Sequence, residues 1–189
     1  MQKTGVVFIT TGGAAREFFA RQVEAGSYRF LDKFPTTVLD ERALTEQYEG
    51  CAIKQSKSLK TRLHSLSPYD YTLYLDIDVK VTRPLGEELL TPLERGYDFC
   101  LAYAKEYCYG DEATPQTGAL LFRKCVENEQ MFIEWHTEWA KRRGLDEPVL
   151  QQVIARKPRK IAWWNHKVHS RESSALFYHR QGAIRTGQV

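Results

Sequence analysis

The chain has 189 residues, with 27 Lys and Arg against 24 Asp and Glu, and 42% of its residues are hydrophobic. This composition predicts one soluble globular domain over residues 1–189, because two full domains would not fit comfortably in this length. The longest apolar stretches fall far short of the roughly 20 residues of a membrane-spanning helix, and no signal-peptide pattern is present, so we expect a cytoplasmic protein without a membrane span.

The charge is unevenly distributed along the chain. Residues 156–189 contain eight Lys and Arg against Glu172 alone, a net charge of +7, which leaves −4 for the first 155 residues of a chain whose total is +3. We expect this basic segment to face either an anion or water. The total charge is too small to indicate nucleic acid as a partner. The four cysteines match neither a close-pair zinc spacing nor a dense disulfide framework, which predicts reduced thiols.

Strand-forming and helix-forming patterns alternate along the chain. The continuous apolar run Thr72–Leu75 is typical of a strand covered on both faces. The alternation predicts an α/β fold with a mostly parallel sheet flanked by helices, in which ligands bind at the carboxyl ends of the strands. The predicted strands are Val6–Thr10, Thr72–Leu75, Tyr97–Tyr103, Ala119–Arg123, Ile161–Trp164 and Ala175–His179. The predicted helices are Ala14–Ala25, Lys54–Leu66, Val126–Arg143, with Trp135 and Trp139 on its buried stripe, and one starting near Pro148.

Two aspartates, Asp76 and Asp78, follow the most clearly buried of these strands. Their i, i+2 spacing places both side chains on the same side of an extended chain. Adjacent carboxylates repel each other, and carboxylate oxygens suit Mg²⁺ or Mn²⁺ shared with phosphate oxygens. The pair therefore indicates a metal and diphosphate site. The simpler interpretation is that these residues end a strand in solvent and cap backbone amides.

The sequence around this pair, Ser67–Val81, resembles the Asp-X-Asp segment of nucleotide-diphospho-sugar transferases with the GT-A fold. Gln116–Phe122 is similar to the Asn-Ser/Thr-Gly-hydrophobic segment of glycogenin-like members, and Asp146–Leu150 to their Asp-Gln-hydrophobic helix start. Gln116 is one methylene longer than the family's Asn, and Glu147 replaces an amide with a charge. The resemblance implies a single GT-A-like (Rossmann-like) domain that transfers a sugar from a nucleoside diphosphate to an acceptor hydroxyl in a metal-dependent reaction.

The resemblance also implies which residues hold the metal and the donor. Asp76, Asp78 and His179 would bind Mn²⁺ or Mg²⁺, with His166 and His169 as alternatives to His179. The donor, expected to be a UDP-sugar, would contact a set of residues before, at and after the aspartate strand: Thr10, Thr11, Gly12, Lys60, Asp76 and Gln116. The basic residues Lys167, Arg171 and Arg180 lie in the segment that contains His179 and are candidates for the diphosphate.

Several of these residues have simpler interpretations. Lys57, Lys60 and His64 share one face of a predicted helix, which is either solvated or directed at the donor. Asp146 and Glu147 are candidates for acceptor binding or for the catalytic base, because free amides hold a carboxylate at a helix N-terminus. Asp is also a preferred N-cap residue, so Asp146 alone is better explained as a helix cap, and Glu147 is then the freer group.

Other functions remain open on the sequence. Haloacid dehalogenase-like phosphatases also have an apolar strand followed by Asp-X-Asp, with the first Asp, here Asp76, as nucleophile; however, Val79 and Lys80 depart from that motif. The chain could also be a non-catalytic module that binds a nucleotide sugar or a nucleic acid, although no nucleic-acid motif accompanies the basic segment. For a transferase of this length we expect a small acceptor lobe and an acceptor that is large or is completed by a partner.

Overall fold

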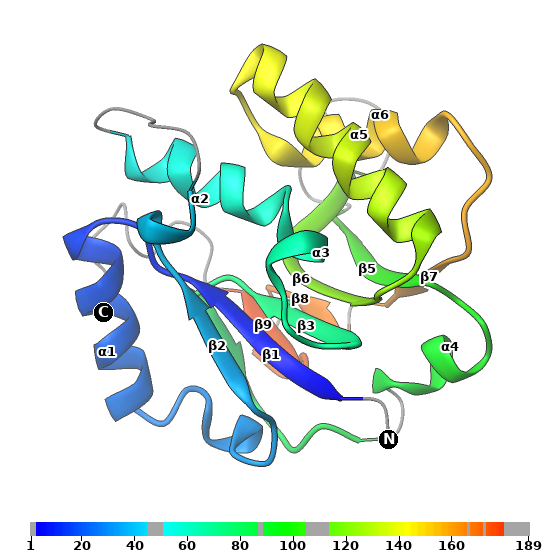
Figure 1. Ribbon diagram of the computed structural model, residues 1–189. Helices are drawn as coiled ribbons and strands as arrows, with labels where there is room; N and C mark the ends of the chain where they lie inside the picture. The colour runs from blue at the N-terminus through cyan, green and yellow to red at the C-terminus, as the bar shows by residue number, and fades with distance from the viewer. Residues whose placement is uncertain are drawn as a thin grey trace.

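The computed structural model describes residues 3–44, 51–86, 89–104, 114–165, 167–171 and 173–179. In this part of the chain, a central sheet separates one layer of helices from a second layer that consists of helices α1 and α4 and a small sheet (Figure 1). No helix in these ranges has both the length and the apolar composition needed to cross a bilayer.

The central sheet has six strands within the described residues, in the order β2-β1-β3-β6-β5-β7. The pairs β1–β2, β1–β3 and β5–β7 are parallel, whereas β6 is antiparallel to both of its neighbours. The α/β fold with a mostly parallel, mixed sheet is therefore confirmed. The strands are β1 Thr4–Ile9, β2 Thr36–Leu39, β3 Tyr71–Leu75, β5 Phe99–Ala104, β6 Thr114–Arg123 and β7 Ile161–Trp164.

Alternate residues of the central strands form two separate cores. In β1, Val6 and Phe8 belong to one core and Val7 and Ile9 to the other, because successive side chains of a strand point to opposite faces. Helix side chains such as Trp135 complete the second core. A sheet buried on both faces explains the continuous apolar run that the sequence shows in β3.

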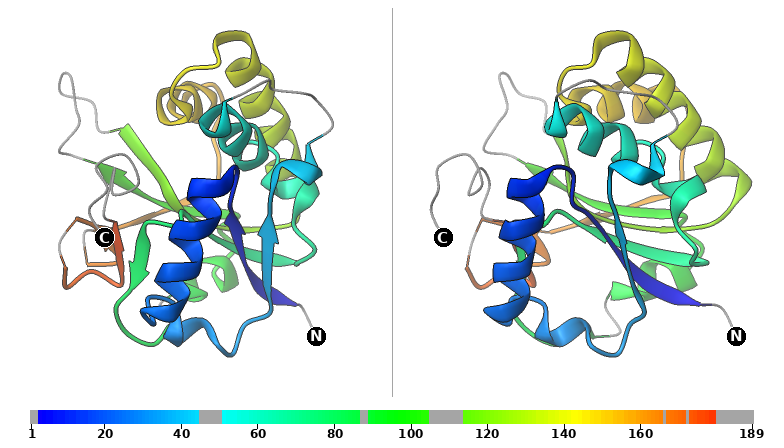
Figure 2. Two further views of the ribbon diagram at one scale, coloured as in Figure 1. Left: turned by 90° about the vertical axis from the view of Figure 1, so that its left-hand side faces the viewer. Right: turned by 60° about the vertical axis from the view of Figure 1, so that its left-hand side comes forward.

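Helices α2, α3, α5 and α6 cover one face of the sheet, and α1, α4 and the small sheet cover the other (Figures 1 and 2). The small sheet has the order β4-β9-β8. Its strands are β4 Val79–Val81, β8 His169–Ser170 and β9 Phe177–His179. The helices are α1 Gly13–Glu24, α2 Ala52–Lys60, α3 Leu63–Leu66, α4 Thr91–Glu94, α5 Val126–Arg142 and α6 Asp146–Ala155, with 3-10 turns η1 Arg29–Leu31 and η2 Glu41–Ala43.

Three sequence predictions differ from the structure. The predicted strand Ala119–Arg123 is the second half of the longer strand β6. The predicted helix Lys54–Leu66 is divided into α2 and α3, because the Thr61 hydroxyl donates to the Ser58 carbonyl at 3.1 Å and Arg62 leaves the helical conformation (φ −116°, ψ 13°). The predicted strand Ala175–His179 is shorter and belongs to the small sheet instead of the central one.

Candidate functional site

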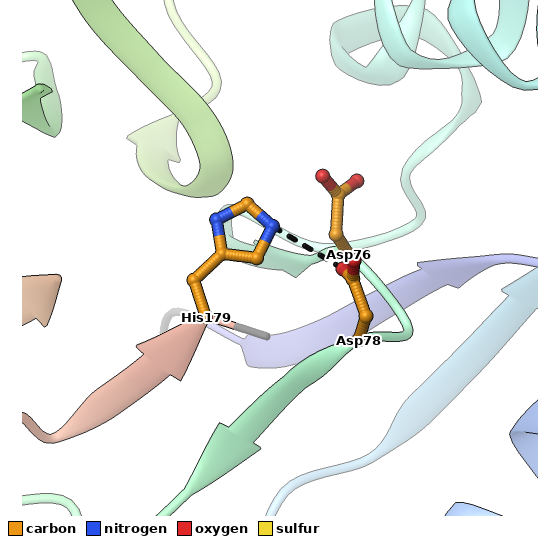
Figure 3. A group of neighbouring side chains, drawn as sticks. All are labelled: Asp76, Asp78 and His179. Atoms are coloured by element: carbon orange, nitrogen blue, oxygen red, sulfur yellow. Dashed lines mark ion pairs between the residues drawn. The ribbon is translucent and has the colours of Figure 1, made fainter. Parts of the chain in front are cut away.

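Asp76, Asp78 and His179 lie together at the carboxyl end of β3 (Figure 3). The Asp76 amide donates to the Gly118 carbonyl on β6 at 2.8 Å, and a tight turn then leads through Asp78 into β4. Because Val79 of β4 pairs with His179 of β9, the histidine reaches Asp78, with Nε2 3.3 Å from Oδ1. One potential ligand atom from each of the three side chains lies within 4.8 Å of the other two.

The environment of His179 favours its interaction with Asp78. Burial lowers the pKa of His179, but the hydrogen bond and charge of Asp78 outweigh burial and raise the pKa above its usual value. Its ring stacks on that of His169, with centroids 5.5 Å apart. A Cβ at Gly118 would lie only 2.5 Å from Cε1 of His179, so the absence of a side chain at position 118 leaves room for this ring.

His179 is the histidine that joins the aspartates among the described residues. The alternative His169 is 1% exposed, and neither of its ring nitrogens has a hydrogen-bond partner in the described part of the chain. Burial lowers the pKa of His169 well below its usual value, and the neighbouring His179 lowers it further. The other alternative, His166, lies outside the described residues.

Lys60 connects this cluster to the start of α6. Its ammonium group lies 3.0 and 3.2 Å from the two carboxylate oxygens of Asp76 and 3.4 Å from Asp146. The side chain of Lys60 is only 7% exposed. Burial lowers the pKa of Lys60, but Asp146 and Asp76 together raise it well above its usual value, so the lysine is charged at neutral pH. The interpretation of Lys60 as part of a solvated helix face is therefore wrong.

Asp146 is not the cap of its helix. Leu145 occupies the N-cap position of α6, and the Asp146 carboxylate instead pairs with Lys57 and Lys60 at 3.4 Å each and accepts a hydrogen bond from Thr117 at 2.8 Å. Burial raises the pKa of Asp146, but the two lysines and Thr117 lower it more, so the group is ionised. The capping interpretation considered only local sequence, whereas these partners come from α2 and β6.

Glu147 differs from its neighbour in the direction of its pKa shift. Burial and the adjacent Asp146 carboxylate raise the pKa of Glu147. A carboxylate that binds a proton more readily is a better proton acceptor than one that two lysines hold as an anion. Of the two predicted catalytic residues, Glu147 is therefore the one that binds a proton more readily.

The loop after β1 packs against α2 and η2. The Thr11 hydroxyl donates to the Ala52 carbonyl at 2.6 Å, and the Gly12 amide donates to Glu41 at 3.3 Å. Gly12 has φ 80°, a conformation that favours glycine. Thr10 is 3% exposed. Because β1 is parallel to β3, this loop follows the same edge of the sheet as the aspartates.

Gln116 lies on β6 two residues before Gly118 and is 8% exposed. Its side-chain oxygen is buried without a hydrogen-bond partner among the described residues. Such an acceptor is costly to bury unless a further group satisfies it. Gln116 thus retains an unused hydrogen-bond acceptor on the strand that borders the cluster.

Three residues that join the site were missed by the sequence analysis. The Tyr74 hydroxyl donates to Asp76, Thr117 hydrogen-bonds Asp146, and Gly118 accepts from the Asp76 amide. The i, i+2 spacing of Tyr74 and Asp76 was the available signal for the first of these. His64, expected on the face of Lys57 and Lys60, instead packs near Phe122 and Phe132, with centroids 6.2 and 6.0 Å away, because the chain turns between α2 and α3.

Two of the predicted diphosphate-binding residues and a cavity lie at the surface of the described residues. Lys167 and Arg171 are exposed, and Arg180 lies outside the described residues. A cavity of about 360 Å³ has none of the site residues in its lining. It is lined mainly by Gly26, Arg29, Lys80, Thr82, Ser173 and Tyr178.

Comparison with solved structures identifies the fold. No family model and no curated sequence matches the chain. Among solved structures, a glycosyltransferase involved in the glycosylation of the major capsid of PBCV-1 superposes with a TM-score of 0.61 and 13% identity, covering 97% of this chain and 96% of that one.

Two further structures match over most of the described fold. The glycosyltransferase GlyE of Streptococcus pneumoniae has a TM-score of 0.57 and 17% identity, covering 94% of this chain and 55% of that one. The galactosyltransferase LgtC, in complex with donor and acceptor sugar analogs, has a TM-score of 0.55 and 15% identity, covering 94% and 87%. The chain therefore has the fold of the GT-A-type glycosyltransferases.

Proposed function

We propose that this protein is a metal-dependent glycosyltransferase that moves a sugar from a nucleoside diphosphate, with UDP as the expected nucleotide, to an acceptor hydroxyl. The observation that carries this proposal is the meeting of Asp76, Asp78 and His179 at the carboxyl end of β3. Ligands of open α/β sheets bind at this edge. The fold shared with known glycosyltransferases adds support.

The three side chains fit a divalent transition ion. Two carboxylate oxygens and one imidazole nitrogen form the donor set, and their potential ligand atoms lie within 4.8 Å of one another. Carboxylates suit Mg²⁺ and Mn²⁺ alike, whereas imidazole is a poorer ligand for Mg²⁺, so Mn²⁺ is the better match. A bound ion would neutralise the negative charge that develops on the departing diphosphate.

The proposed transfer breaks one bond, forms another and releases one proton. The bond between the sugar's anomeric carbon and the diphosphate oxygen breaks, and its electron pair stays on the diphosphate. The acceptor oxygen bonds to the same carbon and releases its proton. Glu147 is the candidate to take this proton, because its pKa is raised, while Asp146 orients Lys60. An inverting reaction uses such a base directly.

The donor would lie between two groups of residues. The loop Thr10–Gly12 borders the edge of the sheet on the β1 side and is proposed to contact the base and ribose. On the other side, the buried ammonium group of Lys60 suits the diphosphate. The side-chain oxygen of Gln116, which has no partner among the described residues, suits a sugar hydroxyl. The acceptor is proposed to be large or to be completed by a partner protein.

A phosphatase with Asp76 as nucleophile is a weaker candidate. Both oxygens of Asp76 are within 3.2 Å of the Lys60 ammonium, and one also accepts the Tyr74 hydroxyl. A nucleophilic carboxylate needs an oxygen free to attack phosphorus. Both oxygens of Asp76 already have partners, which disfavours the attack that this reaction requires.

The test is calorimetry and thermal unfolding with UDP, GDP and CDP, each with and without Mn²⁺, on the wild type, Asp78→Ala and the exposed-site control Asp32→Ala. Stabilisation by a nucleoside diphosphate only with Mn²⁺, lost in Asp78→Ala and kept in Asp32→Ala, supports the transferase. Hydrolysis of a generic phosphate ester without diphosphate preference would indicate the phosphatase. Binding of polynucleotide without any response to nucleotides would exclude both enzymes.

A further inference from the structure

Lys60 contacts both carboxylate oxygens of Asp76, one of the proposed metal ligands. Its ammonium lies 3.0 Å from one oxygen of Asp76 and 3.2 Å from the other, so a cation already neutralises this carboxylate. We propose that Lys60 competes with the divalent ion for Asp76 and thereby makes metal binding depend on the donor nucleotide. This inference rests on the proposed function, because it concerns the same metal and donor.

The charges around Lys60 support a competition. Asp76 is paired with Lys60, and Asp146 with Lys57 and Lys60, so the two carboxylates are balanced by two lysines before any ion arrives. A divalent cation that binds Asp76 brings two further positive charges next to a buried ammonium group. Repulsion between such charges is strong where water is largely excluded, and the side chain of Lys60 is 7% exposed. The repulsion from Lys60 therefore works against the attraction of Asp76 and Asp78 for the ion.

The same geometry lets Lys60 leave Asp76 without losing all its partners. Its ammonium is already 3.4 Å from Asp146 and 3.4 Å from the Thr117 hydroxyl, and neither residue belongs to the proposed metal ligands. Tyr74 still donates to Asp76 after Lys60 moves, so the carboxylate keeps its position. A diphosphate then supplies the negative charge that both Lys60 and the ion require.

This arrangement predicts positive cooperativity between metal and nucleotide, with Lys60 as its source. In the wild type, UDP raises the affinity for Mn²⁺, and Mn²⁺ raises the affinity for UDP by the same factor. Couplings of this kind typically amount to about 5–150-fold. Without the ammonium group, Mn²⁺ binds tightly in the absence of UDP, and UDP raises the affinity for Mn²⁺ only slightly.

The experiment is titration calorimetry of Mn²⁺ with and without UDP on Lys60→Met, which removes the charge and keeps the length of the side chain. Lys54→Met is the control, because Lys54 is an exposed lysine of the same helix. We expect Lys60→Met to bind Mn²⁺ without UDP at least about fivefold more tightly than the wild type, with the enhancement by UDP reduced to near one. Unchanged or weaker Mn²⁺ binding in Lys60→Met overturns the competition.

A second variant, which keeps Lys60, should change the affinity for Mn²⁺ in the opposite direction, and it tests the proposal even if Lys60→Met does not fold. Asp146→Asn removes the other anionic partner of Lys60, so the ammonium is held more by Asp76, and Mn²⁺ binding without UDP should weaken several-fold. Stronger Mn²⁺ binding in Asp146→Asn overturns the proposal. The Mn²⁺-only titrations test the competition even if no nucleotide binds, whereas failure of UDP, GDP and CDP to bind in any variant refutes the proposed function instead.

Discussion

Substitution of Gly118 by Ala is a sharp test of how the metal-ligand cluster is built. A Cβ at position 118 would lie 2.5 Å from Cε1 and 2.7 Å from Nδ1 of His179. Carbon atoms in contact normally lie about 3.5–4.0 Å apart, so β6 or the imidazole must move by roughly 1 Å. The ring has little freedom, because His179 is 7% exposed and stacks on His169.

The expected cost follows from this overlap. Forcing a methyl group into a packed interior costs about 1–3 kcal/mol of unfolding free energy, and each kcal/mol lowers Tm by about 2–4 °C in a chain of this size. Displacement of His179 also disturbs its contact with Asp78, which is 3.3 Å long. Loss of ligand orientation typically weakens metal binding by about 10–100-fold, which we expect for Mn²⁺.

Urea denaturation measures the first effect and Mn²⁺ calorimetry the second. Gly13→Ala is the matched control, because a Cβ there meets no atom within 4 Å and the helical position accepts alanine. That variant should be neutral or more stable by about 0.4–1 kcal/mol. If Gly118→Ala keeps both wild-type stability and wild-type Mn²⁺ affinity, the close packing of Gly118 against His179 does not hold the imidazole in place, and the reasoning is refuted.

Two further substitutions test the first turn of α6. Glu147→Gln should raise stability at neutral pH, because the raised pKa of Glu147 means that the folded state disfavours its charge. The gain in unfolding free energy over the wild type should shrink as the pH falls through the pKa of Glu147 in the folded state toward its ordinary pKa of 4.5. A difference in urea midpoints that does not change with pH would contradict the raised pKa of Glu147. Trp135→Phe should lose about 2–4 kcal/mol of unfolding free energy. It opens a cavity at a fully buried site and removes the indole donor that now lies 3.0 Å from the Asp146 carbonyl. The exposed-site control Trp163→Phe should lose less than about 1 kcal/mol in the same denaturation experiment, and equal losses would count against this packing.

Local patterns were enough to predict the layers of the fold. Alternation and apolar runs identified β1, β3 and β7, and helical spacing identified the buried stripe of α5 that contains Trp135 and Trp139. These predictions succeed because burial on one face imposes a period on neighbouring residues. The division of α2 from α3 was missed, since it depends on the hydroxyl of one residue, Thr61, whose partners include His136 of α5 at 2.9 Å.

By itself, the sequence determined that two carboxylates follow a buried strand and that a histidine ends a later one, because these facts depend only on residues near each other in the chain. The tertiary structure decided that His179, not His169, meets Asp78, and that Lys60 lies between Asp76 and Asp146. It also turned Asp146 from a predicted helix cap into the partner of two lysines. Each of these outcomes depends on strand order and on contacts between distant segments, which no local period encodes.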